Sequence, residues 1–172
     1  MSSSGSSGLD VPSTQLRHDV ELVLADLLTT PFDNESQGLR VSFDVRSGPI
    51  ESQSGRWLDF GFAPSEGDAH QIIFQVNGGS EVLDISPLDE QPYRLVRIAD
   101  ALQEQLIEES WRSVGAATPR PRCPLTGHGH PLQARLLHAD AVWQCPTNRE
   151  CRCSIGKYSQ LVDSYAGGGT RS

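Results

Sequence analysis

All four cysteines and three of the five histidines of this chain lie between Cys123 and Cys153. Thiolate and imidazole are ligands that zinc prefers, and four of them complete a closed, tetrahedral structural site. A Cys-Pro dipeptide opens the segment at Cys123 and recurs at Cys145. The candidate metal ligands are Cys123, His128, His130, Cys145, Cys151 and Cys153. The sequence therefore predicts a structural zinc site in this segment.

Two short strands are expected between the Cys-Pro turns, at residues 132–137 and 141–144, around a turn at residues 138–140. A hairpin with a ligand turn at each end is typical of a small zinc ribbon. A segment of this size buries too little apolar surface to fold alone, so a metal would supply the missing stability. His138 lies in the hairpin turn, away from both Cys-Pro turns, and is not expected to be a ligand.

Six candidates compete for four coordination positions, and two ligand sets satisfy the chemistry. In the first, Cys123 and Cys145 bind together with one histidine and one of the two last cysteines. In the second, both histidines of residues 128–130 complete the site with Cys123 and Cys145. The second set leaves Cys151 and Cys153 as spare thiols.

Other chemistries use the same residues. The cysteines of residues 145–153 could form a disulfide or remain metal-free thiols. A catalytic metal held by His128, His130 and Asp140 with a bound water is a further alternative. Two thiolates nearby favour a closed structural site over a hydrolytic one.

The rest of the chain indicates the cellular compartment in which these thiols are expected. No apolar run approaches the ~18 residues of a membrane span, so no membrane association is expected. The Gly/Ser-rich start lacks the features of a signal peptide. We therefore expect a cytoplasmic protein, in which cysteines stay reduced and clustered thiols act as metal ligands.

Charge divides the chain into an acidic body and a mildly basic tail. Residues 1–114 carry a net charge of −12 and residues 115–172 carry +4, which together give the −8 of the whole chain. Nucleic acid would be repelled by the body, so it would have to bind through the tail. The basic residues available there are Arg120, Arg122, Arg135, Arg149, Arg152 and Lys157.

Hydrophobic periodicity predicts the elements of the body. Apolar residues at spacings of three and four indicate a helix from Ser13 or Thr14 that ends before Pro31, and a second helix from about Pro87 to Trp111. Period-two alternation predicts a strand at residues 39–46. Three further strands are expected at residues 57–62, 71–76 and 81–85, and the last two are joined by a hairpin turn at Asn77-Gly78.

The predicted fold is α+β: a two-layer sandwich of helix, four-stranded antiparallel meander and helix, followed by a small zinc-ribbon-like hairpin. Five segments are expected: a disordered linker or expression remnant at 1–12, the acidic α+β domain at 13–114, a linker at 115–122, the Cys/His hairpin module at 123–158 and a flexible tail at 159–172. Within the last two segments, residues 155–165 are expected to form at most a short strand or helical turn.

The Cys/His module carries a family resemblance. Residues 123–124 read Cys-Pro, residues 128–132 read His-Gly-His-Pro-Leu and residues 141–146 read Ala-Val-Trp-Gln-Cys-Pro. This pattern resembles that of actinobacterial proteins with a Cys-Pro, a His-rich turn ending in Pro-Leu and an Ala-x-Trp-x-Cys-Pro close. The resemblance implies that the two Cys-Pro cysteines and the histidine pair are the common ligand set. It implies no activity.

The body offers few residues for catalysis. It has no Gly-rich phosphate loop, no Gly-x-Ser-x-Gly motif and no cysteine nucleophile. The leading hypothesis is therefore a non-enzymatic interaction or adaptor protein with a structural zinc site and an unknown protein partner. The alternatives are a nucleic-acid-binding protein that uses the basic module, and a metal- or thiol-dependent enzyme.

Overall fold

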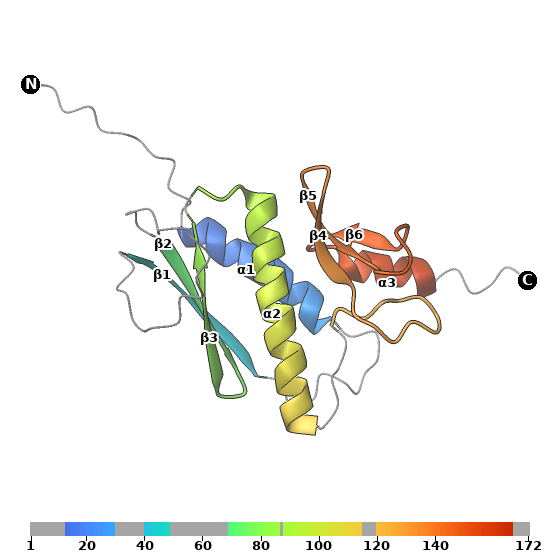
Figure 1. Cartoon of the computed structure of the whole chain (residues 1–172), viewed down its shortest axis with the longest axis horizontal. Coiled ribbons are helices and arrows are strands. Elements are labelled where there is room, and N and C mark those ends of the chain that lie inside the picture. Colours follow the sequence, from blue (N-terminus) through green and yellow to red (C-terminus); the bar gives the residue numbers. More distant parts are fainter. Residues whose placement is uncertain (1–12, 30–39, 49–68, 87, 115–119, 167–172) are drawn as a thin grey trace, which may run out of the picture.

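The computed structural model describes residues 13–29, 40–48, 69–86, 88–114 and 120–166. These residues form three helices and two antiparallel three-stranded sheets (Figure 1). In chain order the elements are α1 Ser13–Leu28, β1 Val41–Gly48, β2 Ala69–Val76, β3 Gly79–Ile85, α2 Gln91–Val114, β4 Gln133–Leu137, β5 Asp140–Gln144, β6 Arg152–Ser154 and α3 Tyr158–Ala166. The expected α+β class is confirmed. None of the helices in the described ranges is both long and apolar enough to cross a bilayer.

The first sheet has the strand order β1-β2-β3. β2 and β3 form the expected hairpin, and its turn residues Asn77 and Gly78 have φ values of 50° and 96°. β1 pairs directly with β2, from Val41 opposite Val76 to Gly48 opposite Ala69. Because β1 and β2 are hydrogen-bonded to each other, no other strand lies between them. The predicted four-stranded meander placed one there, so that strand order is wrong. The strand expected at residues 57–62 lies outside the described residues.

The helix α1 buries the stripe that its apolar spacing predicts. Leu16, Val20, Val23 and Leu27 are fully buried. These side chains share one core with Ile72, Phe74 and Val76 of β2. Two carboxylates lie on the same buried stripe, Asp19 and Asp26, which are 0% and 3% exposed. Buried carboxylates need partners, and each of these two binds a different part of the molecule.

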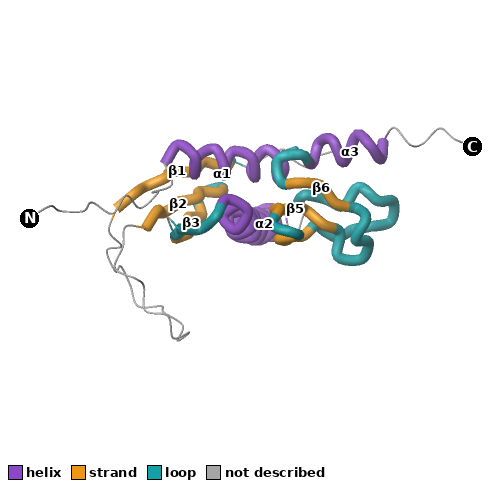
Figure 2. Tube along the Cα trace, turned by 90° about the horizontal axis from the view of Figure 1, so that it is seen from above, coloured by secondary structure: helices purple, strands orange, loops and turns teal. Residues whose placement is uncertain are grey.

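The helix α2 lies between the two sheets (Figure 1). It contacts β2 and β3 with one side and β4 and β5 with another. Figure 2 shows α2 in one layer with both sheets, whereas α1 and α3 lie along the same side of that layer. The arrangement differs from the expected sandwich, in which both helices cover a single sheet. Ile98, Leu102 and Leu106 are buried because α2 is covered on both flanks.

A buried ion pair joins the two long helices. Arg94 of α2 donates two hydrogen bonds to one carboxylate oxygen of Asp19, at 2.9 and 3.1 Å. Gln15 and Gln91 donate to the other oxygen of Asp19, at 3.1 and 2.9 Å. The carboxylate is therefore fully partnered, which a buried charge requires.

The second sheet has the order β4-β5-β6. β4 and β5 form the predicted hairpin around His138 and Ala139, whose φ values of 50° and 69° are those of a two-residue type I′ turn. β6 adds a strand that the sequence did not indicate. Residues 159–166, expected to belong to a flexible tail, continue the helix α3, which buries Tyr158 and Leu161. Burial of these two side chains holds the helix against the module.

The C-terminal module shares its core with the body. Leu132, Trp143 and Tyr158 are fully buried in the cluster that also contains the apolar residues of α1 and α2. Arg120 falls in the expected linker, but it is only 2% exposed and donates a hydrogen bond to the carbonyl of Leu27. Its guanidinium is therefore not a surface charge. Arg120 is not available to contact nucleic acid, contrary to the expectation from the sequence.

Candidate metal centre

Four of the six predicted ligands converge in the structure. The ligand atoms of Cys123, His128, His130 and Cys145 all lie within 4.8 Å of one another. The Nδ1 atom of His128 is 3.5 Å from the sulfur of Cys123 and 3.5 Å from that of Cys145. The Nε2 atom of His130 is 3.2 Å from the sulfur of Cys145. This group could hold a metal ion.

These distances match the edges of a small tetrahedron. With zinc–sulfur and zinc–nitrogen bonds of about 2.3 and 2.05 Å, tetrahedral geometry places sulfur and nitrogen ligands about 3.5 Å apart. Three of the four sulfur–nitrogen pairs in the cluster lie at 3.5, 3.5 and 3.2 Å. A single ion could therefore bind between these atoms, all of which lie within 4.8 Å of one another.

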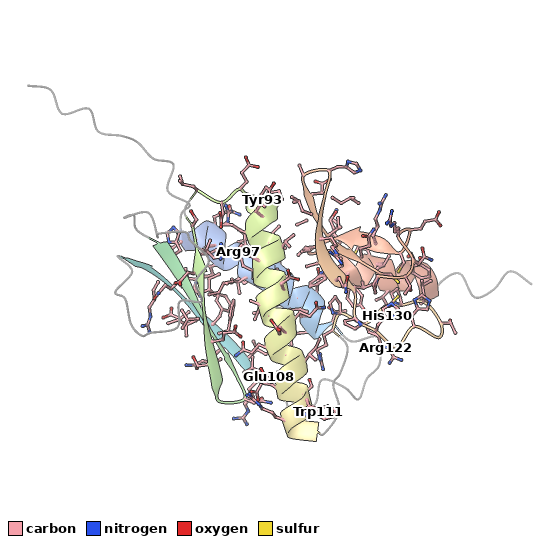
Figure 3. The ribbon with its side chains drawn as sticks, in the orientation of Figure 1. Tyr93, Arg97, Glu108, Trp111, Arg122 and His130 are labelled. Atoms are coloured by element: carbon pink, nitrogen blue, oxygen red, sulfur yellow. The ribbon has the colours of Figure 1, made fainter. Side chains whose placement is uncertain are left out.

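A closed loop presents the first three ligands. Cys123 and His130 stand at its two ends, where the Cys123 N–H donates to the His130 carbonyl at 3.2 Å. Arg122 and Pro131 form an isolated antiparallel bridge just outside them. His128 lies within the loop, and its ring centroid is 4.9 Å from that of His130. The loop thus brings residues up to seven positions apart in sequence to one point. In Figure 3, His130 and Arg122 lie at the end of the module that is remote from the first sheet.

A second loop presents Cys145. The Cys145 N–H donates to the Cys151 carbonyl at 2.9 Å, and the Cys151 N–H donates to the Asn148 carbonyl at 3.1 Å. Within this loop the backbone N–H of Asn148 donates to the sulfur of Cys145 at 3.3 Å, and the hydroxyl oxygen of Thr147 lies 3.3 Å from that sulfur. Hydrogen bonds that point at a sulfur stabilise its thiolate form, which is the form that binds metal.

The two cysteine ligands have opposite electrostatic surroundings. Burial alone would raise the pKa of Cys145, but hydrogen bonds from Thr147, His130 and His128 outweigh it and lower the pKa to about 5. Burial raises the pKa of Cys123 to about 12. Cys145 is thus prepared as a thiolate by protein groups alone. A bound cation would oppose this effect of burial and stabilise the Cys123 thiolate.

The other two cysteine candidates take different positions. The sulfur of Cys151 is 3.9 Å from that of Cys123, and the side chain is completely buried. Cys153 lies in β6 opposite Trp143 and is not part of the four-residue group. All four cysteines are free thiols. The arrangement corresponds to the second predicted ligand set, in which two cysteines and both histidines suffice.

Asp140, the carboxylate ligand of the catalytic alternative, lies away from the cluster. Asp140 begins β5 at the hairpin turn, opposite Leu137, whereas Gln144 at the far end of the same strand precedes Cys145. A strand advances about 3.4 Å per residue, so four residues place Asp140 about 14 Å along the strand from that end. Asp140 is outside the cluster, and His138 lies in the same turn. The expectation that His138 is not a ligand agrees with its position.

Asp26 of α1 holds the C-terminal module against the body through three hydrogen bonds. Its carboxylate accepts hydrogen bonds from the indole Nε1–H of Trp143 at 2.8 Å, from the backbone N–H of Tyr158 at 3.0 Å and from the backbone N–H of Gly156. Burial raises the pKa of Asp26, and the three N–H donors oppose that effect. All three partners are donors, so they are best satisfied by the carboxylate form.

Gln103 of α2 holds the base of the first ligand loop. Its Nε2 amide donates to the carbonyl of Leu132 at 2.7 Å and to the carbonyl of Arg120. Between these residues, the Leu132 N–H donates to the Pro121 carbonyl at 2.7 Å. The hydroxyl of Tyr158 donates to the Arg122 carbonyl at 2.7 Å. Both ends of the loop are therefore fixed to the core.

Sequence reasoning did not find these supporting residues. One signal was available for Asp19 and Asp26, because both interrupt the apolar stripe of α1 and are seven residues apart on one helix face. A charged residue on a buried stripe needs a partner elsewhere in the fold. The sequence holds no corresponding signal for Gln103, because its partners are backbone carbonyls.

Comparison of the chain with protein-family models, with curated proteins and with solved structures found no match. The function is therefore argued from the geometry of the site.

Proposed function

We propose that this chain is an interaction protein whose C-terminal module is stabilised by a structural zinc ion bound to Cys123, His128, His130 and Cys145. The observation that carries the proposal is the convergence of these four ligand atoms within 4.8 Å. Two sulfur and two nitrogen ligands complete the tetrahedral coordination of zinc, and no position remains for a reactive water. The role proposed for the metal is therefore to hold the fold.

The location of the cluster supports a structural role. One ligand loop precedes β4 and the other follows β5, and among the described residues the backbone hydrogen bonds of these loops run within each loop and not between them. A metal ion between them would cross-link the loops and stabilise the folded state in proportion to its affinity. Cys123 and Cys145 are 3% and 1% exposed, so the ion would be largely shielded from water.

Exposed aromatic side chains on α2 support the interaction role. Tyr93 and Trp111 are 53% and 61% exposed, and Figure 3 shows them at opposite ends of this helix. Tyrosine and tryptophan are enriched where proteins bind one another, because they bury much apolar area with few rotatable bonds. Leu88, just before the helix, is 81% exposed.

The zinc proposal is tested by measuring metal content and zinc affinity in protein purified without added metal. We expect one zinc per chain, and we expect Cys145→Ser to lose it. Cys153→Ser is the matched control, because it removes a thiol of the same module that is outside the cluster. A native protein with four titratable thiols and no uptake of zinc would contradict the proposal.

The interaction role is tested with a photo-crosslinking amino acid at position 111 in living cells. We expect a discrete adduct that is absent when the same amino acid replaces exposed Asp163 of α3. Adducts of equal yield and identity at both positions would contradict a binding surface on α2.

A further inference from the structure

A third cysteine sulfur lies beside the two that belong to the proposed metal site. The Sγ atom of Cys151 is 3.9 Å from that of Cys123. A disulfide needs about 2.05 Å between sulfur atoms, so each sulfur would have to move by about 1 Å. Side-chain rotation supplies movement of that size. The proposed function makes no use of the Cys151 thiol.

The backbone holds the two thiols at this separation. Cys123 is fixed by its N–H bond to the His130 carbonyl, and Cys151 is fixed on both sides by its bonds with Cys145 and Asn148. The two cysteines therefore belong to different loops, which are tied independently to the module. Such a pair meets at high effective concentration, because neither residue can leave without breaking its loop.

We propose that Cys123 and Cys151 are a peroxide-oxidisable thiol pair, and that their disulfide removes Cys123 from the metal and releases the ion. The metal-release part rests on the proposed function, whereas formation of the disulfide does not. Once Cys123 is withdrawn, His128, His130 and Cys145 remain as three ligands. A site with three of its four ligands binds zinc much more weakly.

The reaction balances with a hydroperoxide as the oxidant. The sulfur of Cys123 attacks the peroxide, the O–O bond breaks, and Cys123 becomes a sulfenic acid while the other oxygen leaves as hydroxide. The Cys151 thiol then attacks the sulfenic sulfur, and its proton leaves with the hydroxyl group as water. Two thiols lose two electrons, and hydrogen peroxide is reduced to two water molecules. A metal ion bound at this site would favour the first step, because it would hold Cys123 as a thiolate.

Burial limits the oxidant to small molecules. Cys123 and Cys151 are 3% and 0% exposed. The side chains of His128 and His130 are half-buried, whereas Thr126, Gly127 and Gly129 of their loop are exposed, so the thiols are covered by only a thin layer. Hydrogen peroxide is close to water in size, but glutathione disulfide is not. We expect oxidation by hydrogen peroxide and little reaction with glutathione disulfide while the protein stays folded.

The test compares zinc-loaded wild-type protein with Cys151→Ser and with Cys153→Ser as the matched control. Zinc release is followed with a colorimetric chelator after addition of hydrogen peroxide, and the disulfide is mapped by peptide mass spectrometry. Wild type and Cys153→Ser should lose two hydrogen atoms, yield a Cys123–Cys151 peptide and release zinc. Cys151→Ser should keep its zinc stoichiometry before oxidation, form no Cys123 disulfide afterwards and leave Cys123 as the sulfenic acid or a higher oxidation state.

The outcomes separate this inference from the proposed function. Oxidised wild type without a Cys123–Cys151 disulfide, or with a disulfide mapped to Cys145, would overturn the inference and leave the zinc site standing. Protein that takes up no zinc would overturn the proposed function. In that case, disulfide mapping in the metal-free protein still tests whether Cys123 and Cys151 form a disulfide. A Cys123–Cys151 disulfide would support the proposed pair, and its absence would overturn it.

Discussion

The indole Nε1–H of Trp143 donates a hydrogen bond of 2.8 Å to a carboxylate oxygen of Asp26, across 117 positions of sequence. Trp143 lies in the strand that leads to Cys145, and Asp26 lies in the first helix of the body. Both side chains are buried, at 0% and 3% exposure. Through this hydrogen bond α1 helps to position the strand that leads to the candidate metal site, although α1 carries none of the ligands.

Replacing Asp26 should destabilise the whole chain. Asp26→Asn places an amide N–H₂ group where N–H donors of Trp143, Gly156 and Tyr158 need an acceptor. We expect a loss of about 3 kcal/mol in the free energy of unfolding, because buried donors are left without partners. Urea unfolding monitored by tryptophan fluorescence measures it. Asp163→Asn, on an exposed position of α3, should change the free energy by less than about 0.5 kcal/mol.

The two arginines of α2 should differ sharply in their contribution to stability. The side chains of the Arg94–Asp19 pair are 5% and 0% exposed, whereas those of Arg97 and Asp89 are 46% and 27% exposed. Arg94→Met should cost about 3 kcal/mol, because it leaves the buried carboxylate of Asp19 without its counter-charge. Arg97→Met should cost about 1 kcal/mol or less.

Chemical denaturation of both arginine variants tests this difference, and a double variant identifies its cause. Removing both charges with Asp19→Leu and Arg94→Met should recover part of the stability that Arg94→Met loses, because no charge then stays buried alone. Equal losses for Arg94→Met and Arg97→Met would show that the Arg94 pair is no more important than a surface contact.

The same substitution at two neighbouring glutamines of α2 should have opposite effects. Gln103→Met removes the amide that donates to the carbonyls of Arg120 and Leu132, and should cost about 2 kcal/mol. In the part of the chain that the structure describes, the buried Oε1 of Gln105 has no hydrogen-bond partner. Gln105→Met should therefore be neutral or stabilising by up to about 1 kcal/mol.

Thermal unfolding of the two glutamine variants checks their signs. Zinc affinity provides a second readout, because only Gln103 holds the base of the ligand loop. We expect weaker zinc binding in Gln103→Met and unchanged binding in Gln105→Met. A stabilised Gln103→Met protein would contradict the role assigned to this side chain.

Stability supplied by zinc should disappear as pH falls. The metal-bound form needs unprotonated His128 and His130 and both cysteine thiolates, so it carries fewer protons than the metal-free protein. The difference in melting temperature between zinc-loaded and chelator-treated protein should be full near pH 8 and shrink as pH falls, because protons then compete with the metal for its ligands. Cys145→Ser should show little difference at any pH. A difference that grows on acidification would contradict the ligand set.

Local pattern was sufficient for most of the elements. The stripe of α1, the alternation in β1 and the Asn77-Gly78 turn between β2 and β3 each depend on residues a few positions apart, so periodicity reveals them. The hairpin of β4 and β5 was predicted for the same reason. The order of the first sheet was not, because pairing of β1 with β2 depends on contacts between distant segments.

The sequence by itself determined the chemistry of this protein: six thiol and imidazole groups in two turns around a hairpin, of which four suffice for a metal. Only the tertiary structure decided which four converge, because the spacing between two loops depends on hairpin register and on docking against Asp26 and Gln103. It also placed Cys151 beside Cys123, a contact between residues 28 positions apart. Side-chain type is encoded locally, whereas distances of 3–4 Å between loops are set by packing of the whole core.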